Sequence, residues 1–120
     1  MAPAHIQHEL IPRAGQQGVH SLVVTIADQT WSAEADDAFA ALCEIRRDLE
    51  REGWMLAIEG SRVRSYPSGM QRDQGGGLWV YRLEPGASAG RDSQRSIFDS
   101  VDVSECGTVA EQLAYFTRFF

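Results

Sequence analysis

Cysteine is scarce in this sequence, and long apolar runs are missing. The two cysteines, Cys43 and Cys106, lie far apart and form no CxxC pair, which argues against a disulfide framework and a cysteine metal motif. No run of about 18 apolar residues occurs, and the first residues lack the basic start and apolar stretch of an export signal. We therefore expect reduced cysteines, no membrane span and a cytoplasmic location.

Basic residues are outnumbered by acidic ones. The 120 residues include 11 basic and 17 acidic side chains, for a net charge of −6. This charge repels phosphate backbones and anionic lipid surfaces, so we expect neither nucleic acid nor membrane as a partner. It favours solubility, or attraction to a basic protein partner. With 43% hydrophobic residues the chain has material for one core, and we expect a single domain over residues 1–120.

Motifs that carry catalysis are equally sparse. The triple glycine at residues 75–77 is followed by no GK[ST], and no serine lies in a GxSxG motif. His5 and His8 would point to opposite faces of a strand, which disfavours a metal site. We expect no metal, no cofactor and no catalytic residue; enzyme activity stays open, but a non-catalytic protein is favoured.

Two extended segments open the chain, at residues 5–13 and 19–27. The glycines of AGQQG between them permit a reversing turn, which predicts a hairpin. In the second segment Leu22, Val24 and Ile26 alternate with mostly polar residues, which predicts a sheet covered on one side.

The strongest pattern predicts a helix over residues 33–52. Thr30 or Ser32 can supply the N-cap, and Gly53 lies where a left-handed residue commonly ends a helix. Trp54 should then pack on the end of the apolar stripe, as in a Schellman ending. The stripe recurs at spacings of three and four and consists of Ala35, Ala38, Phe39, Leu42, Ile45 and Leu49.

The second half predicts three further strands and a closing helix. Residues 54–66 read as a long strand with a bulge near Gly60 or Ser61, and residues 78–84 as its hairpin partner. Residues 85–95 are small and polar, which predicts a mobile surface loop. Residues 96–103 alternate well enough for a fifth strand.

The closing helix begins where Thr108 and Glu111 show capping-box spacing. Its expected inner stripe contains Val109, Leu113, Phe116 and Phe120. The predicted fold class is therefore α+β: one antiparallel sheet of about five strands, with the long helix and the C-terminal helix packed on one face, in the order ββαβββα.

Arginine and aromatic residues concentrate around the predicted hairpin of the third and fourth strands. Such residues supply rigid area and several hydrogen-bond donors at protein interfaces. A pocket between sheet and helices lined by Arg62, Tyr66 and Arg72 would instead suit an anionic ligand. The candidate partner-binding residues, including three acidic residues that form a second possible patch, are Arg62, Arg64, Tyr66, Arg72, Asp73, Trp79, Glu34, Asp36 and Asp37.

The runs LAIEGSRVRSYPSGMQRDQGGGLWVYRL and GTVAEQLAYF resemble a group of short, uncharacterised bacterial α+β proteins. The overall profile, a small acidic single domain, is similar to that of bacterial toxin-immunity proteins. The resemblance implies a non-catalytic protein that neutralises a toxin by covering it, with a basic toxin domain or another protein as partner. A homodimer is compatible with both readings. The alternative is a small enzyme or ligand-binding domain with an anion-accepting pocket between the sheet and its helices.

Overall fold

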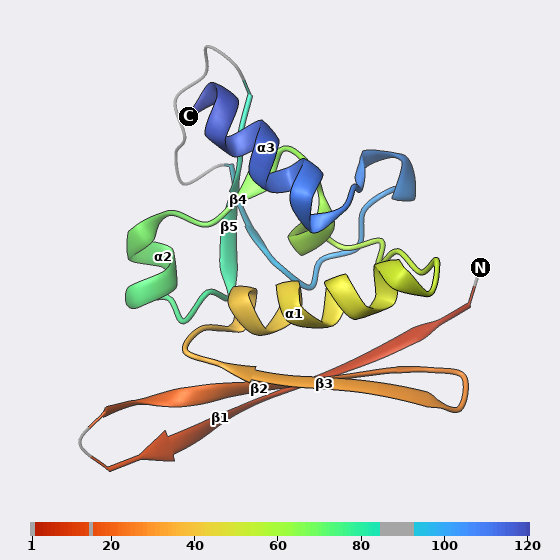
Figure 1. Ribbon diagram of the computed structural model, residues 1–120. Coiled ribbons are helices and arrows are strands. Elements are labelled where there is room, and N and C mark those ends of the chain that lie inside the picture. Colours follow the sequence, from red (N-terminus) through yellow and green to blue (C-terminus); the bar gives the residue numbers. More distant parts are fainter. Residues whose placement is uncertain (1, 15, 85–92) are drawn as a thin grey trace.

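A long β-hairpin opens the fold, and a third strand completes its sheet (Figure 1). The computed structural model describes residues 2–14, 16–84 and 93–120. The three strands are β1 (Ala4–Arg13), β2 (Gln16–Ile26) and β3 (Gln29–Ala35), all antiparallel in the order β1-β2-β3. The predicted hairpin is confirmed, and Leu22, Val24 and Ile26 lie on its buried face as expected.

The third strand occupies the place where the helix was predicted to start. A two-residue turn reverses the chain after β2, with Ala27 at a positive φ of 55°. Trp31 packs against the core whereas Ser32 and Glu34 are exposed, which is the alternation of a strand. The prediction of a helix from residue 33, capped by Thr30 or Ser32, was wrong. Ala33 and Ala35 fit the two-residue period of a strand as well as the 3.6-residue period of a helix.

Helix α1 (Ala38–Arg51) lies across the inner face of this sheet (Figure 1). Asp37 is its N-cap and accepts a hydrogen bond from the Ala40 amide at 2.8 Å. The amide of Trp54 donates to the Leu49 carbonyl at 2.9 Å, and Gly53 has a φ of 81°, so the predicted Schellman ending is confirmed. The predicted stripe is also confirmed within the helix: Ala38, Phe39, Leu42, Ile45 and Leu49 are buried.

The second half forms its own sheet and does not extend the first. Its strands are β4 (Ser65–Tyr66), β5 (Trp79–Arg82) and β6 (Gln94–Ser96), antiparallel in the order β4-β5-β6. The prediction of one five-stranded sheet was therefore wrong. The predicted loop over residues 85–95 is also too long, since β6 begins at Gln94; residues 85–92 lie outside the described residues.

The segment predicted as a long third strand is mostly not a strand. A 3₁₀ helix, η1 (Glu59–Ser61), stands where the bulge was expected. A Cβ atom on Gly60 would lie 2.5 Å from the Cδ2 of Leu42, so the chain turns here directly against α1 and cannot continue as a strand. A short helix, α2 (Gly69–Asp73), joins β4 to β5 in place of a simple turn.

Helix α3 (Val109–Phe119) closes the fold after another 3₁₀ helix, η3 (Val103–Glu105). The prediction of a fifth strand over residues 96–103 was wrong, because β6 ends at Ser96 and the residues after it form a turn and an isolated bridge between Ser100 and Ile58. The capping box is confirmed: the Glu111 amide donates to the Thr108 hydroxyl at 3.1 Å, and the Thr108 amide donates to the Glu111 carboxylate at 2.8 Å. The inner stripe was only partly right, because Leu113 and Phe120 are 47% and 52% exposed.

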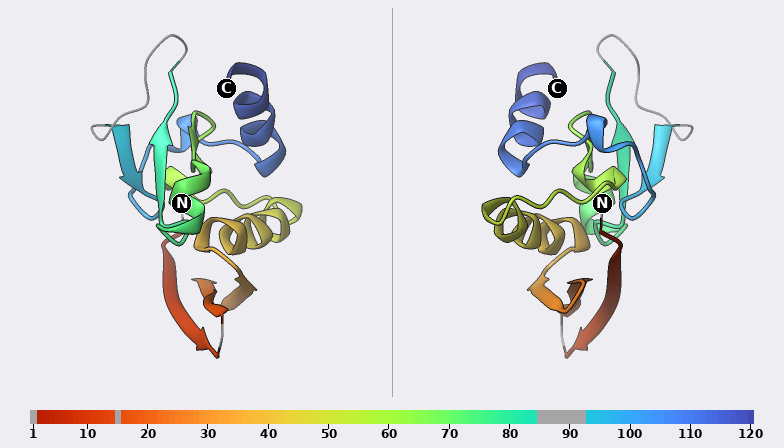
Figure 2. Two further views of the ribbon diagram at one scale, coloured as in Figure 1. Left: turned by 90° about the vertical axis from the view of Figure 1, so that its left-hand side faces the viewer. Right: turned by 90° about the vertical axis from the view of Figure 1, so that its right-hand side faces the viewer.

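Helix α1 is the centre of the architecture. The β1-β2-β3 sheet lies on one side of it, and the second sheet and α3 lie on the other (Figures 1 and 2). Together these layers form one α+β domain. None of the helices in the described part of the chain has the length and apolar character needed to cross a membrane.

Candidate functional site

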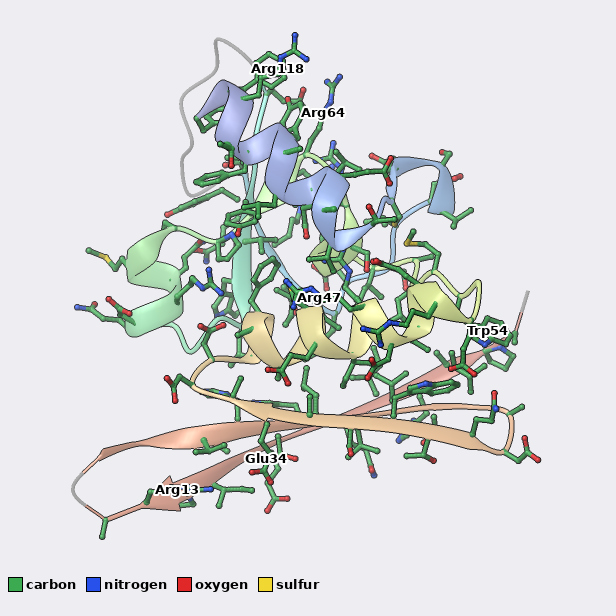
Figure 3. All side chains as sticks on the ribbon, in the orientation of Figure 1. Arg13, Glu34, Arg47, Trp54, Arg64 and Arg118 are labelled. Carbon is green, nitrogen blue, oxygen red and sulfur yellow. The ribbon has the colours of Figure 1, made fainter. Side chains whose placement is uncertain are left out.

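Aromatic side chains gather near the end of α3. The ring of Tyr115 lies 4.9 Å from that of Phe119 and 6.2 Å from that of Phe120, and the two phenylalanines are 47% and 52% exposed. The guanidinium groups of Arg64 and Arg118 lie 5.4 Å from the rings of Tyr115 and Phe119 respectively. Figure 3 shows both arginines at this end of the molecule. We call these five residues the aromatic surface.

A second set of rings fixes α3 against the rest of the domain. Phe116 stacks on Tyr66 with ring centroids 4.2 Å apart, and Tyr66 meets Phe39 of α1 edge-on at 5.2 Å. The hydroxyl of Tyr115 donates to the Leu83 carbonyl at 3.2 Å. Tyr66, predicted to bind a partner, therefore lies between two helices, and the aromatic surface is held on a rigid support.

Buried polar groups add a further link between α1 and α3. Arg46 is 2% exposed, and its guanidinium donates to the Gly60 carbonyl at 2.9 Å, the Gly107 carbonyl at 3.0 Å and the Gln112 side-chain oxygen at 2.6 Å. Burial lowers the pKa of Arg46. The Gln112 amide nitrogen donates in turn to the carbonyls of Gly60, Arg62 and Ser65. We call Arg46 and Gln112 the polar lock.

Sequence reasoning missed the polar lock. Arg46 follows Leu42 by four residues and precedes Leu49 by three, which places it on the buried stripe of α1. Gln112 follows Val109 by three residues and precedes Phe116 by four, which places it on the inner stripe of α3. The signal was therefore present, but polar residues on an apolar stripe do not reveal which groups will satisfy them.

Arg62, a predicted binding residue, lies inside a network of charges. Its side chain is only 10% exposed and pairs with Glu105 at 3.0 Å and Glu84 at 3.3 Å. Arg64 shares Glu84 at 3.2 Å but is 53% exposed. Arg64 therefore remains accessible as part of the aromatic surface, whereas the partners of Arg62 hold it in the interior.

A buried carboxylate anchors the same region. Glu59 is 1% exposed and accepts a hydrogen bond from the Ser65 hydroxyl at 2.8 Å and two from the guanidinium of Arg82. The hydrogen bonds from Arg82 to Glu59 raise the pKa of that arginine. Glu59 was not predicted as a special residue; like the polar lock, it joins segments that are distant in sequence.

The glycine-rich segment caps the first turn of α1. The Ala38 amide donates to the Gly76 carbonyl at 2.7 Å, and Arg72 pairs with the N-cap Asp37 at 3.2 Å. Gly77 has a φ of 69°, and a Cβ there would lie 2.5 Å from the Oδ1 of Asp37. These glycines form a turn, and the predicted residues Arg72 and Asp37 meet here.

The remaining predicted residues do not join the aromatic surface. Glu34 lies on the exposed face of the first sheet, at the opposite end of the molecule from Arg64 (Figure 3). Asp36 and Asp73 are exposed in the segments around the start of α1 and the end of α2, and Trp79 at the start of β5 is 43% exposed. The predicted set thus divides among at least three regions.

The described structure has a shallow cleft of about 410 Å³ over Gln7, Glu9, Ser21 and Val23 on the first sheet, and two further clefts bear on the predictions. A cleft of about 190 Å³ between α1 and α3 is lined by Tyr66 and Arg72 but not by Arg62, so the predicted three-residue pocket does not assemble. A larger cleft of about 610 Å³ lies between β1 and residues 54–58, with mainly apolar walls. His8 is one of its few polar lining groups.

Titratable groups suited to metal or thiol chemistry are dispersed. Among the described residues, no three His, Cys, Asp or Glu side chains stand close enough to hold a metal ion. His8 and His20 share a hydrogen bond of 2.8 Å, and burial together with the charge of His20 lowers the pKa of His8. Burial raises the thiol pKa of Cys43 and Cys106, which reduces their reactive thiolate fraction.

No protein family model matches the chain, and no curated protein matches it.

Proposed function

We propose that this domain is a non-catalytic protein-binding module that acts by covering its partner, as an immunity protein covers a toxin. The observation that carries the proposal is the aromatic surface. Exposed clusters of aromatic and arginine side chains are typical of the residues that dominate protein binding energy. Phe119 and Phe120, about half exposed, supply apolar area that water solvates poorly.

The support under the aromatic surface favours binding without rearrangement. The stack of Phe116 on Tyr66 and the bond from Tyr115 to Leu83 fix α3 before any partner arrives. A preorganised surface loses less conformational entropy on association, which increases affinity. Arg64 and Arg118 add donors at its border, and the net charge of −6 favours a basic partner at long range.

The alternative, a ligand-binding domain with an anion pocket, has weaker support. Tyr66 and Arg72 do line one cleft, but its volume of about 190 Å³ is small for a ligand site. Arg72 is paired with Asp37, and Arg62 with Glu84 and Glu105. The arginines that were expected to accept an anion are thus occupied by the protein's own carboxylates.

The test is co-expression with any toxin-like protein that is found encoded beside this gene, followed by calorimetry with the purified pair. We expect the parent protein to protect growth and to bind. The double variant Phe119→Ala/Phe120→Ala should weaken binding at least about tenfold, because interface aromatics commonly contribute more than 1 kcal/mol each. The matched control is Met70→Ala on α2, which is 68% exposed and lies outside the aromatic surface.

Two results would count against the proposal. Undiminished binding by the double variant, with a melting temperature equal to that of the parent, would remove the aromatic surface from the interface. Failure of the parent to bind or protect against any toxin-like neighbour would remove the inhibitory function itself.

A further inference from the structure

Strand β1 has a free edge along its whole length. It pairs with β2 on one side, and no described strand pairs with its other side. Both views in Figure 2 show no segment beside this edge at the level of the sheet. The unpaired backbone donors and acceptors of such a strand are a template for another strand.

Little in the sequence protects this edge. Natural proteins block free edges with lysine, proline, bulges or short strands. This chain has no lysine, and β1 is ten residues long. Pro12 and the only register irregularity, between Ile11 and Arg13, lie at one end of the strand. The segment 4–10 therefore offers regular, unprotected backbone.

We propose that two copies of this chain pair antiparallel through the free edges of β1, about a two-fold axis at Gln7. This register pairs the whole of segment 4–10 with itself and leaves Pro12 outside. On the outer face of the sheet, His5 of each copy then lies opposite Glu9 of the other, and Gln7 lies opposite its own copy. The Glu9 carboxylate can accept a hydrogen bond from the imidazole of His5, and such polar cross-strand pairs stabilise a sheet, so the register is complementary in chemistry as well as in length.

Neighbouring registers are less favourable. An axis at Glu9 would place the two Glu9 carboxylates opposite each other, and like charges directly opposite each other destabilise a sheet. An axis at Leu10 would bring Pro12, which has no amide hydrogen, into the paired segment. A register shifted from the proposed one by an odd number of residues would place the apolar side chains of one copy on the outer face of the joint sheet.

The inner face of β1 also gains from this pairing. Ile6 and His8 line the cleft of about 610 Å³, and Leu10 is 53% exposed. In the proposed register Ile6 lies opposite His8 of the other copy, and Leu10 lies opposite its Ala4. The second strand therefore covers apolar surface beside a cleft that β1 alone leaves open.

A cysteine on the axis tests the geometry. Gln7→Cys brings two thiols together at a cross-strand pair, where Cα atoms lie about 4.5–5.5 Å apart, within disulfide range. We expect rapid disulfide-linked dimers under mild oxidation. The matched control is Ser32→Cys, exposed on the same sheet face but on β3, which should cross-link no faster than the parent with its native Cys43 and Cys106. Equal cross-linking of the two variants would overturn the proposal.

Charge reversal tests the register. In sedimentation experiments up to hundreds of micromolar, the parent should show a monomer–dimer equilibrium. His5→Glu should raise the dimer dissociation constant about tenfold because it places two pairs of carboxylates opposite each other. Adding Glu9→Lys to this variant should restore dimerisation.

A parent that stays monomeric over this range, or a folded double variant that fails to recover, overturns the proposal. Neither substitution touches the aromatic surface, so toxin binding and dimerisation can fail independently.

Discussion

The two halves of this domain are held together by different means. The first sheet has strands of 10, 11 and 7 residues and packs on α1 through apolar side chains. The second has strands of 4, 3 and 2 residues. Six of the eight buried polar or charged residues in the described structure lie between residues 59 and 112, and a seventh, Arg46, points its guanidinium towards them.

This difference shows that short, irregular strands need specific polar partners where regular strands need only an apolar face. An apolar face tolerates substitution if volume is preserved. A buried hydrogen-bonded group does not, since removing one member leaves the others unsatisfied. The second half should therefore be more sensitive to single polar substitutions.

The largest expected effect comes from the polar lock. Arg46→Met keeps most of the side-chain length but leaves the Gln112 side-chain oxygen and the Gly107 carbonyl without the arginine as donor, while the Gly60 carbonyl keeps only its bond from Gln112. We expect a loss of about 3 kcal/mol in the free energy of unfolding, measured with urea. The adjacent, exposed Arg47→Met should change it by less than about 0.5 kcal/mol. An equal loss of unfolding free energy in the two variants would mean that the second half does not depend on the buried hydrogen bonds of Arg46.

A smaller effect is expected where the glycine segment of the second half meets α1. Gly77→Ala would place a Cβ 2.5 Å from the Oδ1 of Asp37 and 2.8 Å from the Phe39 amide nitrogen at a φ of 69°. We expect about 2 kcal/mol of destabilisation in thermal unfolding. Gly69→Ala is the control, because nothing lies within 4 Å of its Cβ position. A melting temperature that falls equally in both variants would contradict this role for Gly77.

The smallest effect concerns the histidine pair of the first sheet, His8 and His20. The pKa of His8 is lowered in the folded state, so the unfolded chain, with a value of about 6.5, takes up a proton at higher pH. His8 therefore contributes stability above about pH 6.5 that is lost as pH falls through its folded pKa. His8→Phe, which keeps a ring against His20 and Phe98, should flatten the decline in melting temperature between about pH 7.5 and 5. If melting temperature falls with pH equally steeply in His8→Phe and in the parent, His8 does not contribute this pH dependence.

The sequence predicted what depends on periodicity and capping, and little beyond that. The first hairpin, the buried stripe of α1, the Schellman ending at Gly53 and the capping box of α3 all follow from local patterns. The start of α1 was misplaced because Ala33 and Ala35 fit a strand as well as a helix. The separate second sheet was missed because Gly60 turns the chain against Leu42, a contact between segments far apart in sequence.

The candidate site was harder to predict than the fold. Arg62 and Arg64 were both predicted to bind a partner, but the structure separates them: Arg64 is 53% exposed in the aromatic surface, whereas Arg62 is only 10% exposed and pairs with Glu84 and Glu105. Two arginines that are two residues apart in a predicted strand look alike until their partners are placed. Phe120 was expected on the inner stripe of its helix, yet it is 52% exposed.

The polar lock also bears on how the chain acquires its structure during synthesis. Arg46 finds its acceptors at Gly60, Gly107 and Gln112, so the last of them is translated 66 residues after the arginine. Until that stretch has emerged from the ribosome, the arginine must stay hydrated, and α1 cannot dock fully on its neighbours. The native state can therefore form completely only after α3 has been synthesised. A ribosome-bound intermediate that ends before Gln112 should leave α1 accessible to chaperones.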